Sequence, residues 1–150
     1  MWKRLLSTDD NTAALIARLT IALVIFPHGA QKLFGWFGGH GFAGTMDFFT
    51  RWGFPSFLVF LLIVTESIGM LLLAAGFLGR LWAAATAVVM VVAVWKARHF
   101  THFFMNWYME ARRPEGFEYH LLVMGLVLIV LIFGSGRWSA DRALSRNVSP

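Results

Sequence analysis

Ionisable side chains lie within long apolar segments of this 150-residue sequence, at positions that a membrane would surround. A charge at the centre of a bilayer costs roughly 3 kcal/mol or more unless it meets a partner, the interior of a helix bundle or water. Charges that a sequence places there are therefore candidates for ligand binding or proton transfer. The candidates in this chain are Arg18, His28, Lys32, Glu66, Lys96 and Glu118.

The depths of these residues place most of them in the outer half of one helix bundle. At about 1.5 Å of rise per helical residue, Glu66 lies near the midplane, and the others except Arg18 lie further out. His28 and Lys32 are four residues apart and share a helix face. We expect one cavity, in which His28 is the principal hydrogen-bond donor and Glu66 the proton acceptor, the two catalytic candidates. The expected substrate-binding residues are His28, Gln31, Lys32, Glu66, Lys96 and Glu118.

Arg18 lies deeper than the other candidates, roughly 6 Å from Glu66 in height at the same rise per residue. An arginine side chain covers that distance, so Arg18 and Glu66 are predicted to form a structural ion pair. Simpler interpretations stay open: the pair could only fix helix register, and His28 could only satisfy a carbonyl group freed by Pro27. The candidates near span ends could extend to the membrane interface: Lys32, Lys96 and Glu118.

The composition identifies the environment of these charges. Hydrophobic residues make up 58% of the chain and charged residues 14%, against about a quarter charged in soluble domains. The mean hydropathy is +0.65. We therefore expect an all-α integral membrane protein, folded as one domain over residues 1–150, with a four-helix transmembrane bundle and short interfacial helices. The predicted spans are residues 13–34, 55–76, 81–100 and 118–135.

The segment ends carry local signals. Asn11 and its neighbours offer a cap for the first span, which is expected to be retained because its apolar run is of full spanning length. A short interfacial helix is expected around residues 42–52, where aromatic residues share one face. Ser139 is expected to cap a last short helix that has Asp141 in its first turn.

The net charge of +5 comes from basic residues scattered at segment ends, which favours contact with anionic lipid headgroups and excludes a nucleic-acid partner. Outside the spans, six basic residues lie on the side of the termini and four on the other. The termini are therefore predicted to be cytoplasmic. The chain has no cysteine, which excludes disulfides, thiol relays and iron–sulfur ligation by its own residues.

A metal site is a minor alternative. His99 and His102 are three residues apart and His120 begins the last span, so an external site that includes Glu110 or Glu118 is conceivable. Isolated histidines at such spacing are common, and no metal is predicted.

Several sequence blocks resemble those of the DoxX family of small bacterial membrane proteins. They are PHGAQKLFGWFGGHGFAGT (residues 27–45), Phe54-Pro55, TESIGMLLLAAGFLGR (residues 65–80), Phe117-Glu118 and GSGRWSADRAL (residues 134–144). The resemblance implies a four-helix bundle in the bacterial inner membrane. It also groups the chain with the DoxD subunit of thiosulfate:quinone oxidoreductase and with the methylamine-utilisation protein MauE.

The leading functional hypothesis is a quinone- or quinol-interacting subunit of a membrane oxidoreductase. No intrinsic cofactor is expected, and the candidate ligand is a bound quinone; the electron donor is not identified, because the chain shows no flavin or nicotinamide signature. The expected partners are membrane lipid and a membrane or peripheral redox protein. Two alternatives remain: a carrier or binding protein for a small molecule, and a structural accessory subunit of a membrane complex. Assembly as a homo-oligomer and catalysis by the chain alone are left open.

Overall fold

The computed structural model describes residues 5–96, 99–111 and 114–147. All regular elements within these ranges are helical, which confirms the predicted all-α class. In chain order they are α2 (Thr12–Phe34), η1 (Trp36–Gly38), α3 (Gly41–Arg51), α4 (Ser56–Glu66), α5 (Ile68–Ala75), α6 (Gly79–Lys96), η2 (His99–Thr101), α7 (Glu118–Phe133) and α8 (Ala140–Asn147).

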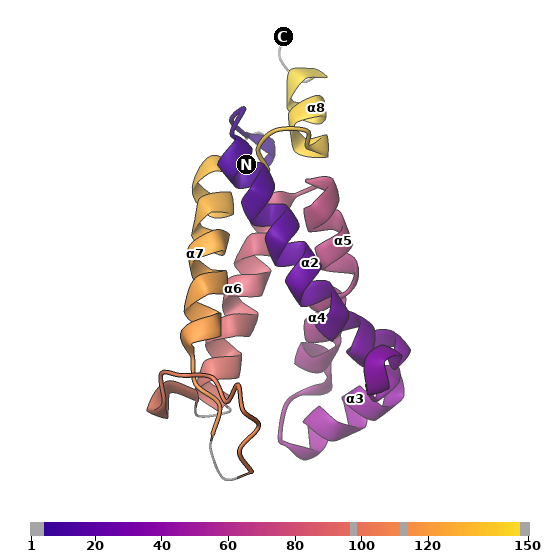
Figure 1. Cartoon of the computed structure of the whole chain (residues 1–150). Coiled ribbons are helices and arrows are strands. Elements are labelled where there is room, and N and C mark those ends of the chain that lie inside the picture. Colours follow the sequence, from indigo (N-terminus) through magenta and orange to yellow (C-terminus); the bar gives the residue numbers. More distant parts are fainter. Residues whose placement is uncertain (1–4, 97–98, 112–113, 148–150) are drawn as a thin grey trace.

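Within these ranges, three stretches are long and apolar enough to cross a membrane: α2 with 23 residues, α4 and α5 together with 20, and α6 with 18. The last predicted span is the shorter apolar helix α7, of 16 residues. It covers about 24 Å at 1.5 Å per residue, which is shorter than a hydrocarbon core of about 30 Å. Figure 1 shows α7 alongside α6, with a similar length and slope.

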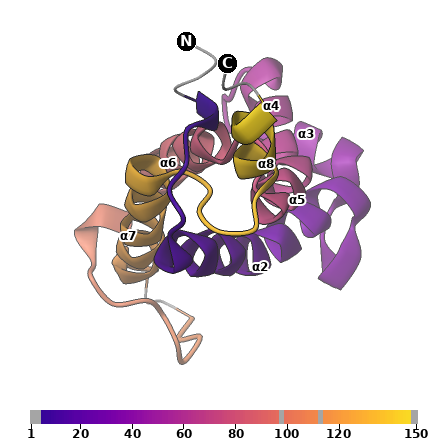
Figure 2. The ribbon, with the colours of Figure 1, turned by 90° about the horizontal axis from the view of Figure 1, so that it is seen from above.

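Both ends of the described chain lie at one end of the bundle. Figure 1 shows the start of α2 and the whole of α8 there, while α3 and the segment that leads into α7 lie at the opposite end. We call these the terminal end and the loop end. Seen from above, the long helices form a ring (Figure 2). Four passes through a membrane account for this arrangement.

Apolar side chains fill the centre of the ring and also cover its outside. Ile21 and Ile25 from α2, Leu73 from α5 and Val127 from α7 are all buried in one core cluster. Large apolar residues are exposed on the outer faces, for example Leu23, Val88, Leu122 and Ile132. An apolar exterior of this kind suits a lipid environment.

The termini of the helices follow local chemistry. Asn11 accepts a hydrogen bond from the Ala14 N–H at 3.1 Å, and Gly35 ends α2 with a φ of 75°. Ser139 accepts from the Arg142 N–H at 3.3 Å, and Asp141 lies in the first turn of α8, as predicted from the sequence. The predicted interfacial helix is α3.

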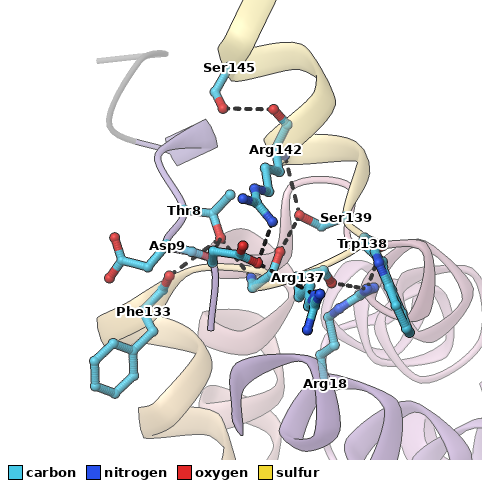
Figure 3. A network of polar contacts seen from close by, with 11 residues as sticks. Thr8, Asp9, Arg18, Phe133, Arg137, Trp138, Ser139, Arg142 and Ser145 are labelled. Atoms are coloured by element: carbon cyan, nitrogen blue, oxygen red, sulfur yellow. Dashed lines mark hydrogen bonds and ion pairs between the residues drawn. The ribbon is translucent and has the colours of Figure 1, made fainter. Parts of the chain in front are cut away.

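Arg18 occupies the terminal end of the bundle, where it binds backbone carbonyl groups. Its guanidinium donates to the carbonyl groups of Leu73 and Ala74 in the last turn of α5. It also donates to those of Arg137 and Trp138, at 3.2 and 2.8 Å, as Figure 3 shows. A buried cation at a helix C-terminus is stabilised by the helix dipole and satisfies carbonyl groups that have no intrahelical partner.

Asp141 accepts hydrogen bonds from backbone N–H groups at the start of α6, whereas Arg18 donates to carbonyl groups at the end of α5. Its two carboxylate oxygens accept from the N–H groups of Leu78 and Gly79, at 2.7 and 3.0 Å, and from the Ser135 hydroxyl at 2.5 Å. Asp141 is buried, and so is Ser135. These hydrogen bonds hold the short α8 against the turn between α5 and α6, so the polar contacts at the terminal end have a structural role.

Candidate functional site

Glu66 is the last residue of α4, at a break in the second apolar segment. Ser67 has a φ of −104° and a ψ of −84°, which separates α4 from α5, and its hydroxyl donates to the Ile63 carbonyl at 2.5 Å. Gly29 of α2 lies opposite this break. A Cβ atom on Gly29 would come within 2.0 Å of the Glu66 carbonyl oxygen. The two backbones are therefore in direct contact, and only glycine fits between them.

The Glu66 side chain is paired with Lys32, one turn further along α2 from His28. The Lys32 Nζ lies 2.5 Å from the Glu66 Oε2, and the Lys32 side chain is 20% exposed. Nζ also donates to the His28 carbonyl group at 3.3 Å. A buried carboxylate at this depth requires such a partner, because an unpaired charge is strongly disfavoured in an apolar environment.

The predicted Arg18–Glu66 pair is wrong, because the two helices meet in a different register. Gly29, which is level with Glu66, is about 16 Å from Arg18 along α2 at 1.5 Å per residue. The prediction assumed that α2 ends at the depth where α4 begins. In the structure, α2 and α4 pack directly on each other, α3 contacts both of them at the loop end, and α4 begins further towards that end than α2 reaches.

An open pocket lies beside the ion pair at the loop end of the bundle. Its volume is about 280 Å³. The Thr45 hydroxyl of α3 donates to the Lys32 carbonyl at 3.2 Å, and Gly39 packs against the backbone of Gln31, so the pocket walls are tied to α2. Lys32 thus connects the pocket to Glu66. The pocket is lined by Gln31, Lys32, Gly38, Gly39, His40, Thr45, Phe48 and Phe49.

The other predicted site residues lie in separate places. The His28 side chain is exposed on α2. The Lys96 ammonium lies 5.0 Å from the centre of the Phe54 ring, on the surface. Glu118 accepts from the Met105 N–H and the Trp107 indole at 2.9 and 2.7 Å. The single cavity predicted from the sequence therefore does not form: Gln31 and Lys32 line the pocket, and Lys32 binds Glu66.

Sequence reasoning missed Tyr119. This residue is in the first turn of α7, and its hydroxyl oxygen is buried with no hydrogen-bond partner among the described residues. A polar group in the first turn of an apolar span was the available signal. It was overlooked because Glu118 and His120 carry more obvious chemistry.

The metal alternative gains no support from the structure. Within the described ranges, no three His, Cys, Asp or Glu residues are grouped so that they could hold an ion. The His102 Nδ1 lies 2.8 Å from the Thr101 hydroxyl, and His120 is buried in α7. The side chain of His99 lies outside the described part of the chain.

A second pocket, of about 390 Å³, lies between α6 and α7 at the loop end. Its lining is apolar apart from His120, so it offers space for hydrocarbon and little for polar recognition. It is lined by Met90, Val91, Val94, Trp95, Phe100, Phe117, His120, Leu121 and Met124.

Comparison with known proteins identifies the family. The DoxX family model matches residues 13–99, more than half of the chain. The chain belongs to the DoxX family. It is also similar to the inner membrane protein YqjF of Escherichia coli (strain K12), with 27% identity over 137 residues, which cover 91% of this chain and 95% of that protein. No solved structure matches the chain.

Family membership agrees with the fold. This DoxX protein is a multi-pass protein of the bacterial inner membrane, and the part of the chain that the structure describes has three stretches of spanning length and a shorter apolar helix. Lys32 and Glu66 lie within the range that the family model matches, whereas Tyr119 lies beyond it.

Proposed function

We propose that this DoxX-family protein binds a quinone or quinol at the Lys32–Glu66 pair, as the membrane subunit of an oxidoreductase. The supporting observation is a buried carboxylate, paired at 2.5 Å with a lysine that also lines an open pocket. A concave site with a few convergent polar groups is typical of binding and catalytic centres.

The pocket suits a single ring. Its volume of about 280 Å³ is just below the roughly 300 Å³ at which small-molecule sites start. Phe48 and Phe49 offer apolar contacts for a ring face. The Lys32 Nζ and the Gln31 amide offer hydrogen bonds to a carbonyl oxygen of the ligand. The apolar tail of a membrane quinone would remain in lipid or against the outside of the bundle.

Glu66 supplies the proton chemistry in this proposal. Oxidation of a quinol to a quinone releases two electrons and two protons. Glu66 would accept one proton from a ligand hydroxyl, with Lys32 as the group that relays it. The second proton would leave to water at the mouth of the pocket. Both electrons would pass to an acceptor on a partner redox protein. The chain contributes binding and proton transfer.

Titration with a short-chain benzoquinone and its quinol tests this proposal. We expect the purified protein to bind one equivalent, and Lys32→Gln or Glu66→Gln to weaken binding about tenfold, which corresponds to about 1.4 kcal/mol and to one lost hydrogen bond. Lys96→Gln is the matched control, because it removes the same charge from an exposed site away from the pocket.

The outcomes separate the candidate functions. Equal affinity of the Lys32→Gln and Lys96→Gln proteins would contradict the site. No binding heat from either compound would contradict the quinone proposal and favour a carrier of another small molecule or a structural accessory subunit. Thermal unfolding of each variant shows whether a loss of binding reflects a loss of fold.

A further inference from the structure

His40 lines the same pocket as Lys32 but comes from a different part of the chain. It immediately precedes α3, and its side chain makes no capping hydrogen bond to that helix. His40 is exposed, whereas the Lys32 side chain is 20% exposed beside Glu66. The described lining of the pocket thus offers two titratable groups, one from α2 and one from the turn before α3.

The backbone on both sides of His40 is fixed to α2. A Cβ atom on Gly39 would come within 2.3 Å of the Gln31 carbonyl oxygen, so these two backbones are in direct contact. On the other side of His40, the Thr45 hydroxyl donates to the Lys32 carbonyl at 3.2 Å. Gln31 and Lys32 are adjacent, so both attachments reach the same turn of α2. They hold His40 in a fixed place relative to Lys32.

The His40 ring itself is held by α3. It stacks on Phe48, with ring centres 5.9 Å apart and planes at 18°. Gly44 lies between these two residues at a spacing of one helical turn, and a Cβ atom there would come within 3.0 Å of the His40 Cβ. Stacking covers one face of the imidazole. The ring edge, which carries both nitrogens, stays available to a ligand or to water.

We propose that His40 is the second proton acceptor of the pocket and binds the ring oxygen opposite the one bound by Lys32. This inference rests on the quinone or quinol function proposed above. The pocket, of about 280 Å³, holds little more than one ring, so a ring that meets Lys32 also meets the rest of the lining. A neutral imidazole accepts a hydrogen bond at one nitrogen, and it can then take the proton.

His40 completes the proton transfer that oxidation of a quinol requires. Both O–H bonds of the quinol break, and two C=O bonds form as the ring loses two electrons. One proton goes to Glu66 by way of Lys32, and the other goes to the unprotonated nitrogen of His40. The exposed His40 then releases it to water. The two electrons pass to the acceptor on the partner redox protein. Because it contacts a reacting atom, His40 is a catalytic residue in this proposal.

The charge of His40 should decide which form of the ligand binds more tightly. Neutral His40 accepts from a quinol hydroxyl, whereas protonated His40 donates to a quinone carbonyl. Histidines change between these two states in the range of about pH 5 to 8. The other charged groups around the pocket are already paired: Lys32 with Glu66, and Asp47 with Arg51 on α3.

Titration with a short-chain benzoquinol and the corresponding benzoquinone, without oxygen, tests this role. For the wild type, we expect the quinol to bind about tenfold more tightly at about pH 7.5 than at about pH 5.5, the effect of one hydrogen bond. The quinone should bind equally well or better at the lower pH. His40→Gln keeps a hydrogen-bonding side chain that cannot take up a proton, so its affinities should not depend on pH in this range.

Another histidine at the loop end provides the matched control. His102 is exposed and does not line the pocket. His102→Gln should therefore keep the pH dependence of the wild type. Thermal unfolding checks the fold of each variant, and His40→Asn replaces His40→Gln if the latter does not fold.

The outcomes separate the role of His40 from the function on which it rests. If the wild type binds the quinol and His40→Gln shows the same pH dependence, the role of His40 is overturned and the quinone function stands. If the wild type binds neither compound, both proposals are overturned. Loss of the pH dependence in His40→Gln, but not in His102→Gln, supports both.

Discussion

Gly29 lies so close to Glu66 that a methyl group on Gly29 would come within 2.0 Å of the Glu66 carbonyl oxygen and 2.5 Å of the Ser67 nitrogen. Both neighbours are backbone atoms and cannot move aside as a side chain could. The contact lies at the break between α4 and α5, so it sets the depth and direction of the Glu66 carboxylate relative to Lys32.

Gly29→Ala should therefore be one of the most damaging small substitutions in the chain. We expect a loss of about 2–3 kcal/mol in the free energy of unfolding, because the two backbones must separate. Gly125→Ala is the matched control: this glycine lies inside α7 with no atom within 4 Å of an added Cβ. We expect it to be neutral or to stabilise by about 0.5–1 kcal/mol. Equal effects in thermal unfolding would contradict the close contact.

Arg18 and Glu66 should behave as independent sites. Arg18→Met leaves carbonyl groups of α5 and of the segment before α8 without their donor, and we expect a loss of about 2–4 kcal/mol. Because Glu66 is bound to Lys32 instead, the effects of Arg18→Met and Glu66→Gln should add to within about 0.5 kcal/mol. A coupling above about 1 kcal/mol in this cycle would restore the ion pair that the sequence suggested.

Helix ends and spans could be predicted from the sequence because their causes are local. The Asn11 cap, the Ser139 cap and Asp141 in the first turn of α8 all depend on residues within one turn of each other. The membrane spans can likewise be predicted from the length and composition of the apolar segments. The break at Ser67 was not predicted, since it depends on a contact with Gly29 from another helix.

The site was predicted only in part, for a physical reason. Lys32 and Glu66 could be recognised as candidates because charges at membrane depth are rare. Which cation pairs with Glu66 depends on how far α2 and α4 are shifted along each other. This shift cannot be found by counting residues along one helix. Arg18 was thus assigned to the wrong partner. Lys96 and Glu118 were included because their depth matched, although depth does not show which way a side chain points.

Acid should weaken the contact between Asp10 and α8. The Arg142 guanidinium that donates to Asp10 lowers the pKa of this carboxyl, with further attraction from Arg137 and Arg146. A carboxyl whose pKa is lowered in the folded state adds stability above its unfolded pKa of about 3.9, and this contribution disappears as the pH falls through the folded value.

The Asp10→Asn protein provides the comparison. At neutral pH, we expect its Tm to be slightly lower than that of the wild type. Below about pH 4, we expect its Tm to fall less than that of the wild type, because the asparagine side chain has no charge to lose. Thermal unfolding followed across that pH range measures both. Identical pH profiles for the two proteins would show that the Asp10–Arg142 contact makes no contribution.

The direction of the bundle in the membrane can be tested with single cysteines, because the natural sequence has none. Ala143 is exposed in α8 at the terminal end, and Tyr108 is exposed at the loop end. With cytoplasmic termini, Tyr108→Cys should react with a membrane-impermeant maleimide applied from the periplasmic side, and Ala143→Cys only after the inner membrane is opened. The unmodified protein should not react at all. The reverse pattern would overturn the orientation inferred from the basic residues, and labelling of both cysteines from one side would contradict the fourth crossing by α7.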